Sequence, residues 1–287
     1  MQPGQTFMLW AVGGFLGLLV LEAIFSWRLQ DHRYDRRDTW ASLGSGLGFV
    51  LIGLGTKLGI LWLLTELYAF APYKLPYTWW SWVLCYIVVD FFFYWSHRLG
   101  HETRFGWAIH VPHHNSQFYN LSTALRQSWT THLLFFVFLP IPLLGFDPMM
   151  AFVCNSVNSI YQYWIHTEYV GRLPRPIEWL LNTPSHHRVH HASNPEYLDR
   201  NYGGTFIIWD RLFGTFRREE HRPRYGITSN IESHNLLVVN FHEWAALFRD
   251  LFRARSLREV YLAVLAKPGR GGPNGCGGGK SLATCHP

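Results

Sequence analysis

The sequence has 287 residues, of which 48% are hydrophobic, 17% are aromatic and only 15% are charged. Charged residues make up about 25% of a typical soluble domain, so this chain lacks the polar surface of a water-soluble protein and is too apolar to be disordered. Its formal net charge of +6 is explained by basic residues beside anionic lipid headgroups, and we predict no nucleic-acid partner.

Two apolar segments near the N-terminus predict the first membrane helices. Phe7–Trp27 is interrupted only by Glu22, and about 20 apolar residues are enough to cross a bilayer. No basic residue precedes this segment, so we expect a retained helix rather than a cleaved signal peptide. Leu43–Leu64 follows, and its pairs Gly44/Gly48 and Gly55/Gly59 have the spacing that lets membrane helices approach closely.

Two further apolar segments continue the pattern. Tyr77–Trp95 opens with three tryptophans, which suit the membrane interface, and we predict a third span there. Trp129–Ile165 is broken by Pro140, Pro142 and the turn Gly145–Pro148. We expect two helices folded back on each other in this block.

The distribution of basic residues predicts the orientation. Four arginines follow the first span, whereas the connection Glu66–Thr78 carries only Lys74. Because cytoplasmic connections are rich in arginine and lysine, we place the first connection and everything after Ile165 in the cytoplasm. The predicted fold is an all-α, multi-pass membrane protein with about four to five membrane helices, the last two a hairpin, and a cytoplasmic helical cap. The membrane is a bacterial inner membrane or the endoplasmic reticulum.

We divide the chain into four parts. They are the N-terminal membrane helices (1–76), a histidine-rich catalytic region (77–216), a cytoplasmic amphipathic segment (217–266) and a disordered, Gly-rich tail (267–287). Within the third part, Asn240–Arg258 sets five large apolar residues against four arginines. This pattern is typical of a basic helix lying on a membrane, and a helix packed on the cap is an equal alternative.

Histidine is the anomaly of the composition, with 16 histidines against four lysines. Three clusters have spacings of three and four residues, which bring imidazoles to one side of a helix. They are His97 and His101; His110, His113 and His114; and His187, His190 and His191. Because proline cannot lie deep in a helix, Pro112 predicts that the second cluster straddles a helix start. His166 and His186 are two further candidate ligands.

Eight clustered imidazoles exceed the ligands of one four-coordinate ion, so we predict two metal ions. Neutral imidazole binds iron, zinc, copper and nickel, and the ligands alone therefore do not identify the metal. The chain has no Glu-x-x-His, which excludes the usual carboxylate di-iron bundle. It also has no His-Glu-x-x-His protease motif and no Cys-x-x-Cys.

Three other polar residues are candidate catalytic residues. Asp90 and Tyr94 precede His97 at helical spacing, so they share its helix face. They either orient ligands or form hydrogen bonds between helices. Glu102 directly follows His101 and either bonds a neighbouring ligand or forms a surface ion pair with Arg98, four residues earlier.

The three clusters also carry a family resemblance. The motifs H-R-L-G-H (His97–His101), H-V-P-H-H (His110–His114) and H-R-V-H-H (His187–His191) resemble those of the membrane fatty acid hydroxylase/sterol desaturase superfamily. The resemblance covers roughly Tyr77–Phe216. Its alkylglycerol-cleaving branch is most similar in Tyr119–Ser128, Trp164–Glu168, Asn182–His191 and Asn201–Gly204.

The resemblance implies a membrane-bound non-haem di-iron oxygenase with its site on the cytoplasmic side. Two Fe ions, held by the eight clustered histidines with His166 and His186, would use O2 and two electrons to oxidise a C–H bond of a lipid from the bilayer. The external reductant would be tetrahydrobiopterin or an electron-transfer protein. Two alternatives stay open: a sterol or fatty-acyl hydroxylase or desaturase with an external electron donor, and a non-redox zinc membrane protein.

Overall fold

The computed structural model describes residues 3–268, so that most of the predicted disordered tail, residues 269–287, lies outside the described residues. The elements are α1 (Pro3–Leu29), α2 (Arg36–Ala69), α3 (Trp79–Glu102), α4 (Arg104–His114), α5 (Leu121–Ala124), η1 (Thr131–Phe138), α6 (Pro140–Leu143), α7 (Pro148–Trp164), α8 (Arg175–Leu180), α9 (Pro184–His190), η2 (Pro195–Tyr197), α10 (Ile208–Leu212), α11 (Leu236–Arg253) and α12 (Leu257–Leu265). Residues 3–268 contain two isolated bridges and no β-strand. The all-α prediction is confirmed.

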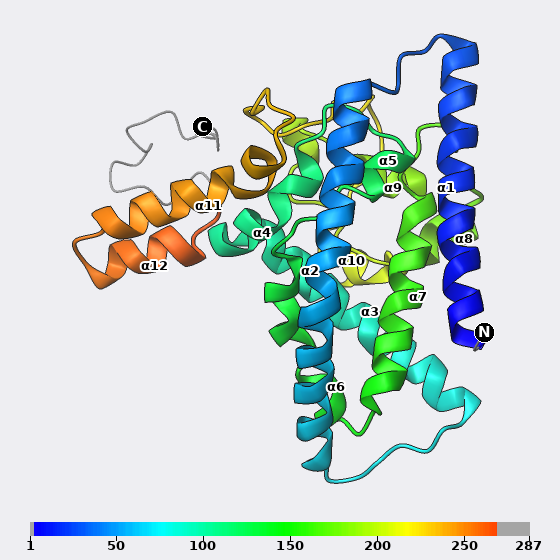
Figure 1. Ribbon diagram of the computed structural model, residues 1–287, viewed down its shortest axis with the longest axis vertical. Coiled ribbons are helices and arrows are strands. Elements are labelled where there is room, and N and C mark those ends of the chain that lie inside the picture. The colour runs from blue at the N-terminus through cyan, green and yellow to red at the C-terminus, as the bar shows by residue number, and fades with distance from the viewer. Residues whose placement is uncertain (1–2, 269–287) are drawn as a thin grey trace.

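The long helices set the direction of the molecule. Figure 1 shows α1, α2 and α7 running along the longest axis, with α3 crossing at an angle. α3 packs against α7 and η1, and the core there contains Cys85 and Val89 of α3 with Met150 and Cys154 of α7. The short helices α4, α5 and α9 lie toward the end of the long helices where α1 is joined to α2 (Figure 1).

The surface of the long helices is strongly apolar. Leu21 of α1 is 64% exposed and Leu58 of α2 is 71% exposed, and such surfaces are normally covered by lipid or protein. By length and composition, α2 is the one helix in residues 3–268 that qualifies as a membrane span. This criterion therefore supports one of the four to five predicted spans.

The fourth apolar block folds back on itself as two unequal limbs. The first limb is a 3-10 helix, η1, followed by the four-residue α6, which begins at Pro140. Gly145 turns the chain with a φ of +88°, a conformation that glycine adopts without steric cost. The second limb, α7, is capped by Asp147, whose side chain accepts a hydrogen bond from Met149 N at 2.8 Å.

Only one of the two predicted glycine pairs makes a close approach within the described residues. A Cβ added to Gly44 or Gly48 would lie 2.8 Å from the Leu236 side chain or 2.2 Å from Trp129 Nε1, respectively. Nothing lies within 4 Å of such an atom at Gly55 or Gly59. Because α6 contacts α2 and Leu64 beyond this pair is buried, Gly55 and Gly59 lie on a side of α2 that no described residue covers.

The predicted amphipathic segment is a helical hairpin, α11–α12, that projects sideways from the body (Figure 1). The inner face of α11 packs on α4, where Arg104 Nε lies 3.1 Å from Glu243 Oε1. Its outer face is uncovered, and Phe252 and Leu257 at the tip are 89% and 88% exposed. One side of the segment thus packs on the cap while the other is free.

Candidate metal centre

The second histidine cluster lies at the end of a helix. Thr103 caps α4 by accepting a hydrogen bond from Gly106 N at 3.0 Å. The helix then runs to His114, so the prediction that the cluster straddles a helix start is wrong. Pro112 lies two residues before the end of α4, so it removes one helical hydrogen bond, to the carbonyl of Ala108, and interrupts no further turns.

The third cluster lies on a short helix that begins as its sequence indicates. Thr183 is the N-cap of α9 and Pro184 occupies the first helical turn, where the missing N–H costs nothing. His166 follows the end of α7 and faces this helix, because its ring centroid lies 4.3 Å from that of His187. The cap thereby meets the end of the long helices at the histidines.

Nine histidines converge in two groups. The first group is His97, His101, His110, His114 and His190, and the second group is His113, His166, His187 and His191. Within each group, one candidate ligand atom per residue lies within 4.8 Å of all the others. The second and third clusters both divide between the groups, since residues four apart differ by about 40° around a helix while neighbours differ by about 100°.

The Nε2 atoms face one another at short distances. In the first group, His110 Nε2 lies 3.0 Å from the Nε2 atoms of both His97 and His114. In the second group, His166 Nε2 lies 3.2 Å from His113 Nε2 and 3.0 Å from His187 Nε2. Nitrogens about 3 Å apart are compatible with metal–nitrogen bonds of about 2.0–2.1 Å.

Backbone carbonyls fix the orientation of four rings. The Nδ1 atoms of His97, His113, His166 and His190 lie 2.8, 3.2, 2.7 and 3.0 Å from the carbonyl oxygens of Tyr202, Arg126, Gln162 and Arg200, respectively. A ring that donates its Nδ1–H to a carbonyl keeps the Nε2 lone pair for a metal. The buried Nε2 atoms of His101 and His191 have no hydrogen-bond partner among the described residues, as expected of atoms that await a ligand.

Burial keeps these imidazoles neutral. It lowers the pKa of His113 to about 4 and the pKa values of His190 and His191 well below their usual range. The neutral ring is the form that binds a metal ion. Orphaned nitrogens, fixed rings and an all-imidazole donor set therefore fit two transition-metal ions.

The loop before α10 supplies two of the orienting carbonyls, and polar side chains build it. Asp210 accepts hydrogen bonds from Tyr202 N and Gly203 N, both at 2.7 Å, and Asn182 Nδ2 donates to Gly203 O at 2.6 Å. Sequence reasoning missed these groups, because every residue has a carbonyl. The motif Asn201–Gly204 was the one available signal.

His186 lies outside both groups. Its Nε2 is 2.9 Å from Glu178 Oε2, and its carbonyl accepts a hydrogen bond from Asn201 Nδ2 at 3.0 Å. The neighbouring His187 belongs to the second group, and adjacent helical residues point about 100° apart. The structure therefore brings together nine of the ten predicted ligands.

Asp90 holds helices and a loop together. Its Oδ1 accepts hydrogen bonds from Thr205 N at 2.7 Å and from the Asn158 amide, and its Oδ2 accepts from Phe206 N at 3.1 Å and Trp209 Nε1 at 2.8 Å. These four donors account for the carboxylate. Of the two predicted roles for Asp90, the contacts are those of the interhelical bond.

Tyr94 and Glu102 also bond away from the grouped histidines. The Tyr94 hydroxyl lies 3.0 Å from Thr215 Oγ1 and accepts a hydrogen bond from Arg98 at 3.2 Å. Glu102 Oε1 lies 3.1 Å from Arg98 Nε in a pair whose side chains are both 25% exposed. The ion pair with Arg98 is the arrangement that the structure shows for Glu102.

Comparison with known proteins agrees with this geometry. The model of the fatty acid hydroxylase family matches residues 82–215, which contain all nine grouped histidines. The predicted resemblance to this family is confirmed. No solved structure matches the chain.

Similarity to individual proteins extends beyond the fatty acid hydroxylase region. The chain is 36% identical to alkylglycerol monooxygenase of Homo sapiens over 269 residues, 90% of this chain and 58% of that protein. It is 38% identical to the Danio rerio protein of that name over 261 residues, with shares of 89% and 58%. An ornithine lipid hydroxylase of Rhizobium tropici is 32% identical over 146 residues, 49% of this chain and 42% of that protein. The chain spans 58% of the length of these two alkylglycerol monooxygenases.

Proposed function

We propose that the protein is a membrane-bound non-haem di-iron oxygenase, an oxidoreductase that uses O2 to oxidise a C–H bond of a lipid. The observation that carries the proposal is the division of nine buried histidines into groups of five and four within a fatty acid hydroxylase region. Similarity to alkylglycerol monooxygenases favours an ether lipid as the substrate. In the balanced reaction, the C–H bond, O2, two electrons and two protons give an alcohol and water.

The nine grouped histidines would hold the metal ions, and their burial excludes water. The first group would hold one iron ion and the second group the other. Iron supplies the oxidising power that an unactivated C–H bond requires, because no side chain can remove such a hydrogen by acid–base chemistry. The neutral rings and their carbonyl partners keep the donor atoms in place, and burial keeps water from the site. Hydroxylation beside an ether oxygen gives a hemiacetal, which collapses to an aldehyde and glycerol.

The membrane arrangement is part of the proposal. We assign α1, α2, α3 and the η1–α7 hairpin to the bilayer, with the histidine groups at the cytoplasmic end in a bacterial inner membrane or the endoplasmic reticulum. The four arginines around the junction of α1 and α2 lie at this end, as the positive-inside rule requires; they are Arg28, Arg33, Arg36 and Arg37. Cysteines placed at Tyr73 and Arg222, in a background without Cys276 and Cys285, test this. A membrane-impermeant maleimide applied to the non-cytoplasmic face should label position 73 and spare position 222, and the reverse would contradict the topology.

The experiment that tests the activity is lipid mass spectrometry in a host supplied with an alkylglycerol. The parent should consume the ether lipid and form a fatty aldehyde only when O2 is present, whereas His190→Ala should form none. His132→Ala is the matched control, because His132 of η1 stacks on Phe49 of α2 and belongs to neither group. Tetrahydrobiopterin and an electron-transfer protein are tested separately as reductants.

The alternatives give different products. If the products are hydroxylated or desaturated sterols or acyl chains and no ether is cleaved, the protein is a sterol or fatty-acyl hydroxylase or desaturase instead of an ether-lipid oxygenase. Full occupancy by zinc without any O2 uptake would contradict an oxygenase altogether. Iron analysis of the purified parent tests the number of metal ions, since about two iron ions per chain are expected.

A further inference from the structure

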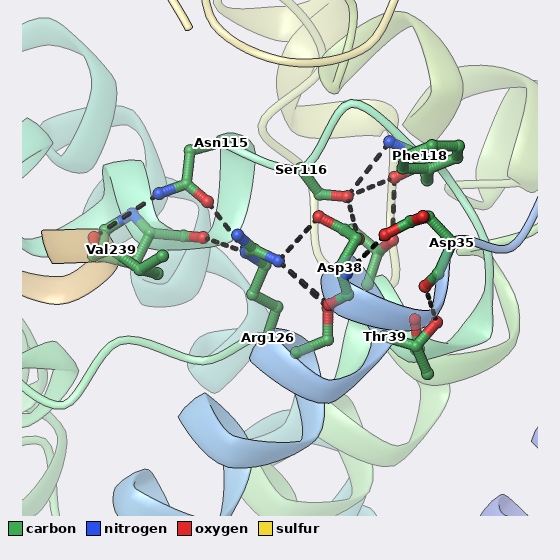
Figure 2. Close-up of polar contacts among 12 residues, drawn as sticks. Asp35, Asp38, Thr39, Asn115, Ser116, Phe118, Arg126 and Val239 are labelled. Carbon is green, nitrogen blue, oxygen red and sulfur yellow. Dashed lines mark hydrogen bonds and ion pairs between the residues drawn. The ribbon is translucent and has the colours of Figure 1, made fainter. Parts of the chain in front are cut away.

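Arg126 is a cation buried inside the cap, with a side chain only 1% exposed. Figure 2 shows its guanidinium between α2 and the end of α4. On the α2 side, Nη1 donates to Asp38 Oδ1 at 3.0 Å and to Ser42 Oγ at 3.3 Å. A buried charge is stable only when it is paired and its hydrogen bonds are satisfied, and Asp38 meets the first need.

The other side of the guanidinium holds the chain that bears two metal-binding candidates. Nε donates to Asn115 Oδ1 at 2.8 Å and to Pro112 O at 3.1 Å. These two residues directly flank His113 and His114 in sequence. A cation that binds a free carbonyl at a helix C-terminus also interacts favourably with the helix dipole, so the last turn of α4 is fixed by this contact.

The main chain of the same residue contacts a histidine ring. Arg126 O lies 3.2 Å from His113 Nδ1. His113 belongs to the second group, and its Nε2 faces His166 Nε2 at 3.2 Å. One residue therefore fixes both the backbone around His113, through its guanidinium, and the ring of His113, through its carbonyl.

We propose that Arg126 is a positioning residue that sets the second histidine group for its metal ion by tying His113 to α2. The inference rests on the proposed metal function. It concerns the second group because the carbonyl contact is made to His113, whereas the first group draws its orienting carbonyls from Tyr202 and Arg200. Lysine cannot replace arginine here, since a single ammonium cannot span Asp38 and Asn115 as the planar guanidinium does.

The test compares Arg126→Lys with a matched buried arginine. Arg104 is 5% exposed, pairs with Glu243 and Asp250, and contacts no grouped histidine. Iron per chain and its loss to a chelator are measured on purified full-length protein, together with the melting temperature. Arg126→Lys keeps the carbonyl contact and loses the guanidinium contacts on either side of His113 and His114. We therefore expect it to release iron to the chelator about 10–100-fold more readily than the parent. Arg104→Lys should lower the melting temperature and keep both ions.

The outcomes separate the two proposals. A parent that never binds two ions contradicts the proposed function, whatever the variants do. A parent with two ions and an Arg126→Lys variant with two equally resistant ions overturns the positioning role. If Arg126→Lys does not fold, Asp38→Asn and Ser42→Ala decide the matter, because the first removes the negative charge that pairs with the guanidinium and the second removes one of its hydrogen bonds. Retention of both ions with the parent's chelator resistance in these variants would also overturn the role.

Discussion

Replacing Asp90 by asparagine should unfold the protein more readily without changing its chemistry. Each carboxylate oxygen of Asp90 takes two donors: Thr205 N and the Asn158 amide on Oδ1, and Phe206 N and Trp209 Nε1 on Oδ2. An amide presents one oxygen and one NH2 group. Whichever way the new side chain is turned, two buried N–H donors lose their acceptor and face another donor.

The cost of this change follows from the two unsatisfied groups. A buried donor without a partner costs about 1–3 kcal/mol, so Asp90→Asn should lower the free energy of unfolding by about 2–6 kcal/mol. This is a large part of the roughly 5–15 kcal/mol that holds a folded protein together. By the usual scaling of about 2–4 °C per kcal/mol, the melting temperature should fall by about 5–20 °C.

Thermal unfolding in detergent, followed by intrinsic tryptophan fluorescence, measures the melting temperature. Turnover per bound iron ion, measured on the folded fraction at low temperature, reports the activity of the variant. It should stay within about twofold of the parent. An unchanged melting temperature combined with a large loss of turnover per iron would refute this reasoning. It would return Asp90 to a catalytic role.

Three further substitutions test the site. His166→Ala removes a ligand of the second group and should reduce iron from about two ions per chain toward one, whereas His132→Ala keeps both; two ions in each variant would remove His166 from the ligand set. Glu102→Gln breaks a partly exposed pair with Arg98 and should change the unfolding free energy by less than about 1 kcal/mol, with turnover within twofold; a tenfold loss would place Glu102 at the metal. Burial raises the pKa of Glu178, but hydrogen bonds from His186, Leu173 N and Thr183 outweigh it and lower the pKa from 4.5 to about 2. The stability contributed by the ionised Glu178 carboxylate is complete above pH 4.5 and disappears as the pH falls toward 2. The melting temperature of the parent should therefore decline more steeply across that window than the melting temperature of Glu178→Gln. Equal slopes would contradict the stabilising contact between Glu178 and His186.

The sequence by itself determined the helical class and the presence of three histidine clusters. Spacings of three and four residues are local properties of a helix, so the three clusters could be recognised without knowing what packs beside them. The candidate ligand His166 could be found in the same way, because Asn158, Gln162 and His166 follow one another at intervals of four residues. Proline misled the prediction at Pro112, because a helix tolerates it near either end and the end of α4 depends on distant contacts such as Arg126 with Pro112 O.

The tertiary structure alone decided how these residues are shared. The split into groups of five and four and the attachment of Asp90 to the loop at Thr205 depend on residues far apart in sequence, and the exclusion of His186 depends on its contact with Glu178, a residue outside the histidine motifs. The sequence shows that a carboxylate or an imidazole is present, but it does not show whether the partner of that group is a metal, an arginine or a backbone N–H. Only the packing of α3, α4 and α9 around one point determines which partner each side chain meets.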